Sequence, residues 1–259
     1  MSRFFFYTVF IFLTIYILAA FLLYFFQRHL LYKPSEKRDH PFQERLIQVN
    51  GAVVNVIVLN PGKREAILYF GGNAGAVAGH GEVFSELFAD HTVYLVNYRG
   101  YGGSTGEPGE AAFYSDALSV YDDIVAEHCQ VSVIGRSLGT GVATYLASQR
   151  EIQKIALVTP YDSITNVAKD QYPFFPVELL LKERYESKRY LSQVKKREVL
   201  MLIAAGDRTI REARSHALAE AVDPTYLTMK TIQGTDHNYI MEDPTFLRTL
   251  QGFFYPDVK

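Results

Sequence analysis

The sequence predicts an α/β protein, with a mostly parallel central sheet covered by helices on both faces and one transmembrane helix before it. Three observations support this prediction. Short apolar runs alternate with stretches of helical periodicity over most of residues 46–259. Residues 135–139 place a serine in a glycine-flanked turn between one such run and a helical stretch. Residues 4–26 contain no charged side chain.

The apolar stretch at residues 4–26 reads FFFYTVFIFLTIYILAAFLLYFF. At about 1.5 Å per residue, a helix of this length crosses a hydrocarbon core roughly 30 Å thick. A signal peptide usually has a shorter apolar core and a small-x-small cleavage site, whereas Ala19 and Ala20 are followed here by more large apolar residues. A buried core helix is a further alternative. We expect an uncleaved membrane anchor at residues 1–28.

A polar connector with two prolines follows, and it predicts a juxtamembrane linker at residues 29–45. The next two apolar runs, 46–49 and 53–59, are separated by Asn50 and Gly51. This dipeptide is a strong signal for a tight hairpin turn. We therefore expect an antiparallel pair of strands at the start of a domain that extends from residue 46 to residue 259.

Six further apolar runs predict strands separated by helices. The clearest helix is predicted at residues 113–127, where apolar side chains recur at spacings of three and four. Alternation of strands and helices implies parallel strands with helices on both faces. The six predicted strands are residues 66–70, 92–97, 131–134, 155–159, 199–205 and 227–232.

Residues 170–191 interrupt this alternation. They contain Tyr-Pro-Phe-Phe-Pro at 172–176, three leucines at 179–181 and then charged residues. One interpretation is an ordinary crossover helix with an apolar face. The other is a lid whose aromatic side chains line a pocket or touch lipid.

Ser137 is the candidate nucleophile. A serine hydroxyl is weakly nucleophilic unless it is held clear of its neighbours and beside a base. A sharp turn from strand to helix meets the first need, and Gly135 and Gly139 give that turn room. A purely structural serine in a glycine-rich turn is the alternative, and the residues that follow in the chain argue against it.

Asp207 follows one later strand and His237 follows the last one. Ser…Asp…His is the chain order of an α/β-hydrolase triad, and it differs from the orders in chymotrypsin and subtilisin. We expect His237 to act as the base and Asp207 to orient it. Asp162 also follows a strand, so it is the alternative acid; otherwise we expect it to organise its loop or to cap the next helix. We expect Asp236 to point elsewhere.

The oxyanion of an acyl-transfer reaction needs preorganised donors. We expect one from the backbone N–H of Leu138 and the other from the backbone N–H of Asn73, in the loop after the first parallel strand. A plain glycine turn is the alternative for that loop, and a phosphate loop would need a lysine that is missing. Arg99 and Tyr101 belong to another glycine-rich loop, and they either shape the site or support the fold.

Charge and cysteine content exclude several other functions. The net charge is −2 without a basic stripe, so we expect no nucleic-acid partner. The single cysteine, Cys129, excludes an intramolecular disulfide and a cysteine-rich metal site. The sequence has no H-E-x-x-H, Walker or G-x-G-x-x-G motif, so it implies no metal and no cofactor.

Three motifs resemble those of a known group. They are NYRGYGGSTG at 97–106, GRSLGTG at 135–141 and GGNAG at 71–75. They resemble membrane-anchored α/β-hydrolases of the bud-emergence type and related α/β-hydrolase-domain proteins, which include depalmitoylases and lysophospholipid lipases. The resemblance extends from about residue 46 to the C-terminus and implies a serine hydrolase without fixing its substrate. One departure is Gly71, which stands where the family commonly has histidine.

The sequence therefore predicts a single-pass membrane protein that cleaves carboxylic esters or thioesters through an acyl-enzyme, with lipid or lipidated substrates as candidates. A peptidase on the same fold and a catalytically silent, membrane-tethered binding domain are the alternatives, and the intact triad argues against the second. Four basic residues follow the apolar stretch and only Arg3 precedes it, which favours a cytoplasmic domain. The four are Arg28, Lys33, Lys37 and Arg38.

Overall fold

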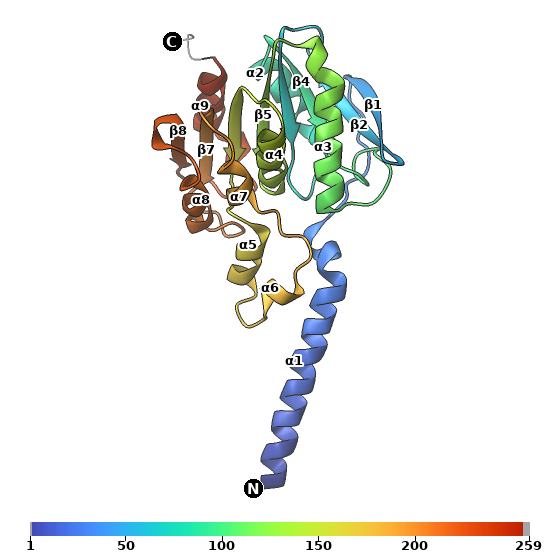
Figure 1. The fold of residues 1–259 in the computed structure, drawn as a ribbon, viewed down its shortest axis with the longest axis vertical. Helices are drawn as coiled ribbons and strands as arrows, with labels where there is room; N and C mark the ends of the chain where they lie inside the picture. Colours follow the sequence, from blue (N-terminus) through green and yellow to red (C-terminus); the bar gives the residue numbers. More distant parts are fainter. Residues whose placement is uncertain (1, 256–259) are drawn as a thin grey trace.

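The protein is built around one eight-stranded sheet, shown in Figure 1 for the computed structural model. The structure describes residues 2–255; Met1 and residues 256–259, the ends of the predicted anchor and domain, lie outside the described residues. The strand order is β1-β2-β4-β3-β5-β6-β7-β8. Strands β3 to β8 pair in parallel, and β2 is antiparallel to both of its neighbours. The predicted mostly parallel sheet is confirmed.

All eight predicted strands are present. They are buried on both faces at the centre of the sheet, which explains their nearly continuous apolar sequences. The predicted helix at 113–127 starts three residues earlier, and its last three residues form a 3₁₀ turn. The strands are β1 Gln43–Val49, β2 Ala52–Leu59, β3 Glu65–Phe70, β4 His91–Val96, β5 Gln130–Arg136, β6 Lys154–Val158, β7 Glu198–Ala204 and β8 Leu227–Ile232.

Helices cover both faces of the sheet. Helices α3, α4, α7 and α8 enclose one hydrophobic core, and α2 and α9 enclose the other on the opposite face. The hairpin forms at Asn50 and Gly51, whose φ angles of 46° and 79° suit a two-residue turn. The helices are α1 Ser2–Leu31, α2 Gly81–Leu87, α3 Glu110–Ile124, α4 Leu138–Gln149, α5 Ile164–Gln171, α6 Val177–Leu180, α7 Ser187–Leu191, α8 Glu212–Ala219 and α9 Pro244–Phe254.

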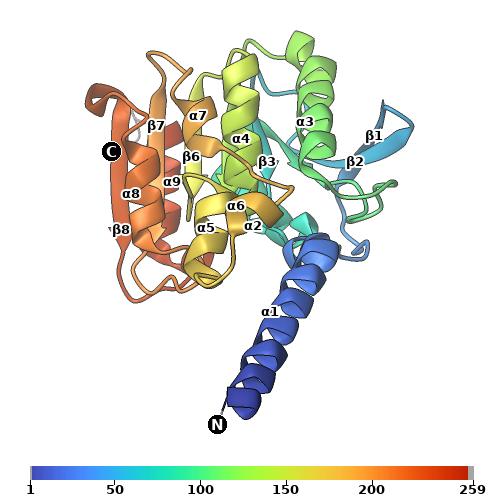
Figure 2. The same cartoon turned by 60° about the horizontal axis from the view of Figure 1, so that its bottom comes forward.

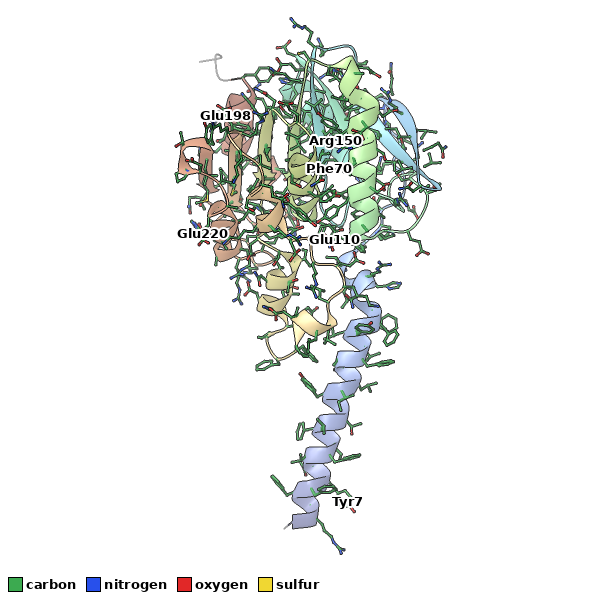
Figure 3. All side chains as sticks on the ribbon, in the orientation of Figure 1. Tyr7, Phe70, Glu110, Arg150, Glu198 and Glu220 are labelled. Atoms are coloured by element: carbon green, nitrogen blue, oxygen red, sulfur yellow. The ribbon has the colours of Figure 1, made fainter. Side chains whose placement is uncertain are left out.

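Helix α1 projects from the domain, and its apolar side chains point outward on all sides (Figure 3). The span Arg3–Leu31 is long and apolar enough to cross a membrane. The helix continues to Leu31, three residues beyond the predicted end of the anchor, and β1 begins at Gln43. Residues 32–42 therefore connect the helix to the sheet.

The segment between β6 and β7 contains three short helices, α5, α6 and α7, instead of one crossover helix. We call residues 164–181, which include α5 and α6, the cap segment. Figures 1 and 2 show it at the end of the domain from which α1 projects, beside that helix.

The start of α4 lies very close to the end of β3. A Cβ atom placed on Gly139 would lie 2.1 Å from the carbonyl oxygen of Phe70 and 2.5 Å from that of Gly71. A Cβ atom on Gly135 would lie 2.6 Å from the carbonyl oxygen of Gly139. These obstructing atoms are backbone, so only glycine fits at either position without moving a strand or a helix.

We predict that Gly139→Ala lowers the free energy of unfolding by at least about 3 kcal/mol, the upper end of the usual overpacking effect. The melting temperature of the full chain in detergent should fall by roughly 10 °C or the chain should fail to fold. Gly252→Ala in α9 is the matched control, because nothing lies within 4 Å of the added atom. It should stabilise by about 0.5–1 kcal/mol. Equal melting temperatures for the two variants would contradict the packing argument.

Candidate active site

Ser137 forms the turn between β5 and α4. Its backbone has φ 51° and ψ −120°, a combination that a non-glycine residue adopts only under strain. Two contacts hold the residue there. Its N–H donates to the carbonyl of Val158 at 2.9 Å, and its own carbonyl accepts from the N–H and hydroxyl of Thr140 at 2.9 and 2.7 Å. The turn therefore presents the hydroxyl at the carboxyl end of the sheet.

The structure brings Ser137 together with His237 and Asp207. The Nε2 atom of His237 lies 2.9 Å from the Ser137 Oγ, and its Nδ1 atom lies 2.7 Å from Oδ2 of Asp207. Ser137 and His237 are only 6% and 8% exposed. Because a carboxylate can only accept, Nδ1 carries a proton and donates it to Asp207. Nε2 of the neutral ring is then free to accept from the serine hydroxyl.

Asp207 is fixed by its own loop. Its Oδ1 atom accepts from the N–H groups of Thr209 and Ile210 at 2.9 and 2.8 Å. The other oxygen, Oδ2, is left for His237. The carboxylate therefore keeps the imidazole in one orientation and one tautomer.

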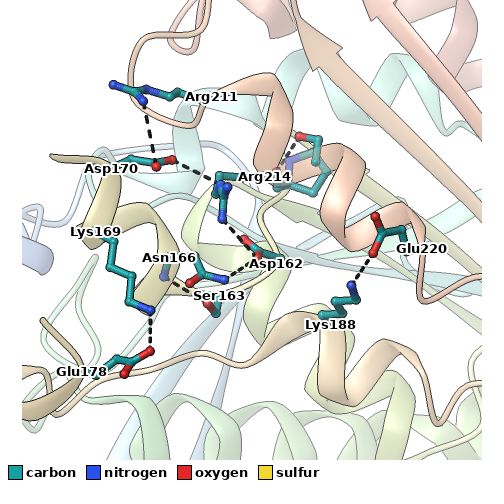
Figure 4. A network of polar contacts seen from close by, with 12 residues as sticks. Asp162, Ser163, Asn166, Lys169, Asp170, Glu178, Lys188, Arg211, Arg214 and Glu220 are labelled. Atoms are coloured by element: carbon teal, nitrogen blue, oxygen red, sulfur yellow. Dashed lines mark hydrogen bonds and ion pairs between the residues drawn. The ribbon is translucent and has the colours of Figure 1, made fainter. Parts of the chain in front are cut away.

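Asp162, the alternative acid, faces a different set of partners (Figure 4). Its Oδ2 atom accepts from Nδ2 of Asn166 at 2.5 Å and lies 3.4 Å from Nη1 of Arg214. The expectation that Asp162 caps the next helix is wrong, because the side chain of Ser163 accepts from the Asn166 N–H instead. Asp162 organises its loop through its backbone carbonyl, which accepts from the N–H of Lys188.

Asp236 turns away from the imidazole, although it is adjacent to His237 in sequence. Its Oδ1 atom accepts from the backbone N–H groups of Asn238 and Tyr239 at 2.9 and 3.2 Å. The carboxylate therefore stabilises the turn that carries the histidine.

Asn73 and Leu138, whose backbone N–H groups are the expected oxyanion donors, line the same cavity as Ser137. Leu138 is the first residue of α4, and an N–H in this position has no acceptor within its own helix. The side chain of Asn73 donates to the carbonyl of Leu31 at 2.8 Å, and its carbonyl accepts from the N–H of Lys33 at 3.0 Å. The loop that carries Asn73 is thus tied to the end of α1.

Gly71, the departure from the family pattern, is buried against Val77. A Cβ atom on Gly71 would lie 3.0 Å from Cγ1 of Val77, so a histidine here would require Val77 to move. The Gly71 carbonyl accepts from the hydroxyl of Tyr98 at 2.8 Å. Burial raises the pKa of Tyr98 well above its ordinary value, so this hydroxyl stays protonated and remains a donor.

Arg99 and Tyr101, from the second glycine-rich loop, have different roles. Arg99 makes a 2.6 Å ion pair with the buried Asp116 of α3, which supports the fold. Tyr101 donates its hydroxyl to the carbonyl of Asn73 at 2.9 Å and accepts from the N–H of Lys33. Tyr101 therefore supports the loop beside Ser137.

Sequence reasoning missed Arg136, which occupies a variable position of the G-x-S-x-G pattern. Its Nη2 atom donates to the carbonyl of His237 at 2.9 Å, and Gly72 leaves room for its guanidinium.

Burial, and secondarily the charge of Arg136, lower the pKa of His80 to about 4. His80 is therefore neutral at neutral pH, and its ring stacks on Phe84.

A cavity of about 270 Å³ begins at Ser137 and extends between the cap segment and α1. Its lining next to the serine comes from Leu138 and Asn73, and most of the remaining lining residues are apolar. Sequence reasoning also missed the contribution of α1, because it assigned that helix to the membrane alone. The α1 residues in the lining are Leu23, Gln27, Leu30 and Leu31.

Residues 65–194, about half of the chain, match the family model described as alpha/beta hydrolase fold. An uncharacterized protein of Mycobacterium tuberculosis is 32% identical over 201 residues, which cover 72% of this chain and 66% of that protein. Protein bem46 of Schizosaccharomyces pombe is 27% identical over 162 residues, which cover 58% and 54% of the two chains. The predicted resemblance to bud-emergence-type hydrolases is thereby confirmed.

A third relative, the lysophosphatidylserine lipase ABHD12 of Mus musculus, is 39% identical over 162 residues, which cover 56% of this chain and 37% of the lipase. The chain thus spans less than two thirds of the length of each of these relatives. Among solved structures, Est1E from Butyrivibrio proteoclasticus superposes with a TM-score of 0.68 at 14% identity, covering 82% of this chain and 98% of its own. This last similarity concerns the fold.

Proposed function

The chain belongs to the α/β-hydrolase fold family, and on this premise we propose that it is a membrane-anchored serine hydrolase that cleaves carboxylic esters or thioesters. One observation carries the proposal. A continuous chain of hydrogen bonds joins Asp207 through His237 to Ser137, at the carboxyl ends of three different parallel strands. The lipase among the relatives supports an acyl ester of a lipid as a candidate substrate.

The geometry supports an acyl-enzyme mechanism. Ser137 Oγ attacks the acyl carbonyl while Nε2 of His237 takes its proton, and Asp207 stabilises the resulting imidazolium. The N–H groups of Leu138 and Asn73 then bind the tetrahedral oxyanion. The imidazolium returns the proton to the leaving alcohol or thiol as the bond to the acyl carbon breaks. A water molecule, with His237 again as base, then attacks the acyl-enzyme. This step releases the carboxylic acid and regenerates the free serine.

Residues 4–26 supply the membrane anchor in this proposal, and the hydrolase domain follows a linker. The four basic residues after the apolar stretch support a cytoplasmic location for the domain, because positively charged flanks tend to be retained on that side. The domain would then act on acyl groups of the cytoplasmic leaflet.

We predict that Ser137→Ala abolishes both labelling by a fluorophosphonate and hydrolysis of a short p-nitrophenyl ester. The activated hydroxyl is the only group that the mechanism offers to either reagent. Labelling is followed by gel fluorescence on the full chain in detergent, and circular dichroism checks that the fold is kept. Labelling of Ser137→Ala at the wild-type rate would refute the assignment of the nucleophile.

We predict that Asp207→Asn lowers turnover by about 10⁴, because the imidazole loses its orienting anion and its tautomer. Asp162→Asn is the matched control, since the same change is made at a second aspartate that follows a strand. It should lower kcat by less than about tenfold, because its carboxylate has no contact with His237 among the described residues. A larger loss of turnover in Asp162→Asn than in Asp207→Asn would identify Asp162 as the acid of the triad.

We predict that a fluorescent protein fused after Lys259 is bright in intact bacterial cells and that alkaline phosphatase fused there is inactive. Both outcomes are expected because the basic flank is retained in the cytoplasm, so the domain and the reporter fused to it stay there. Alkaline phosphatase with an export signal of its own serves as the control for an external location. An active phosphatase on the full chain would place the hydrolase domain outside.

A further inference from the structure

The cavity at Ser137 has helix α1 as one of its walls. Leu23, Gln27 and Leu31 follow one another at intervals of four residues, so they lie on one face of the helix, with Leu30 beside them. Between Leu23 and Leu31 this face extends about 12 Å along the helix axis. The opposite wall comes from the cap segment, with Val167, Tyr172, Phe175, Val177 and Leu180 in its lining. The cavity therefore leads from the nucleophile along the helix.

The cap segment and its continuation are bonded to α1 at both ends of this wall. The Tyr16 hydroxyl donates to the carbonyl of Phe174 at 2.9 Å, and the Tyr16 ring stacks on Phe175 with centroids 5.1 Å apart. Nearer the domain, the amide of Gln27 donates to the Leu180 carbonyl at 3.0 Å and accepts from the Lys182 N–H at 2.7 Å. The cap segment thus follows α1 over about 16 Å.

The domain end of α1 is fixed by a buried carboxylate. Glu183, which is 4% exposed, accepts from Nε of Arg28 at 2.6 Å, from the Tyr32 hydroxyl at 2.8 Å and from the N–H of Glu110 at 2.6 Å. Figure 3 labels Glu110 at the start of α3, next to the base of α1. Burial raises the pKa of Tyr32, so its hydroxyl stays a donor. The wall is therefore held in place relative to Ser137.

The tip of the cap segment is apolar and exposed. Phe174 is 86% exposed and Leu179 is 83% exposed. Phe174 lies level with Tyr16, in the middle of the apolar stretch of α1, where the surrounding medium is lipid if α1 spans the membrane. The cap's Lys169–Glu178 ion pair joins α5 to α6 (Figure 4). Exposed aromatic and aliphatic side chains at this depth are favourable in a bilayer and unfavourable in water.

We infer that α1 is part of the substrate site as well as an anchor: the acyl chain of a membrane-embedded ester enters from the bilayer beside the cap tip and lies against the Leu23–Leu31 face. This inference rests on the proposed ester hydrolysis. It adds that α1 determines which lengths of acyl chain the enzyme accepts. A long chain contacts Leu23, at the far end of the wall. A short chain stays near Ser137 and does not reach it.

The first test replaces Leu23 by tryptophan in the full chain in phosphatidylcholine vesicles. The added ring shortens the cavity, so the ratio of kcat/KM on p-nitrophenyl palmitate to that on p-nitrophenyl butyrate should fall at least tenfold. Leu22→Trp is the matched control, since Leu22 is adjacent in sequence, exposed and absent from the cavity lining. It should keep the wild-type ratio.

An unchanged ratio in Leu23→Trp, with the enzyme active, would overturn the inference and leave the proposed function standing. A wild-type chain that hydrolyses neither ester and does not react with a fluorophosphonate would instead refute the proposed function. Labelling of Leu23→Trp by a short-chain fluorophosphonate shows that the variant is folded at Ser137.

The second test uses the absence of tryptophan from the sequence. Phe174→Trp introduces a single indole at the cap tip, and brominated phosphatidylcholine in the vesicles should quench its fluorescence strongly. Met229→Trp, on the exposed face of β8, is the control and should be quenched little. Equal quenching of the two variants would overturn the entry of substrate from the bilayer.

Discussion

The close approach of α4 to the end of β3 is the constraint on which the rest of the site depends. Gly139 has the carbonyl oxygens of Phe70 and Gly71 where any other residue would have its Cβ atom. This contact places the first turn of α4 against the end of β3, and Leu138 and Asn73 line one cavity. The strained backbone of Ser137, with its φ of 51°, persists because the strand and the helix on either side of it are fixed by their packing.

The parallel topology explains how residues 100 positions apart come to touch. Each parallel strand ends at the same edge of the sheet, so the loops after β3, β5, β7 and β8 converge there. These loops supply the oxyanion donor, the nucleophile, the acid and the base of the proposed mechanism. The neighbouring order β5-β6-β7-β8 leaves one strand between the serine and the aspartate, and the histidine spans the gap with its two nitrogens.

Sequence alone could predict the strands, because central strands buried on both faces are continuously apolar. It could also predict that Ser137, Asp207 and His237 meet, because their order and their places after strands are informative. It favoured Asp207 over Asp162 but left Asp162 as an alternative, since both follow strands. The two differ in partners such as Arg214 and Ile210, which only tertiary structure brings near. The role of Arg136 could not be predicted either, because its guanidinium donates to a backbone carbonyl, which no sequence pattern reveals.

The position of α1 was the least predictable feature, because apolar periodicity cannot distinguish lipid-facing from cavity-lining residues on one helix. Its attachment to the domain shows that α1 and the domain are not independent modules. Without Arg28 and Tyr32, Glu183 would be a buried carboxylate that has lost its charged partner, a strongly unfavourable state. Without the carbonyl of Leu31, the side chain of Asn73 would lose its acceptor beside Ser137. The end of α1 and the loop that carries Asn73 are therefore one shared structure, and the proposed anchor also supports the loop beside Ser137.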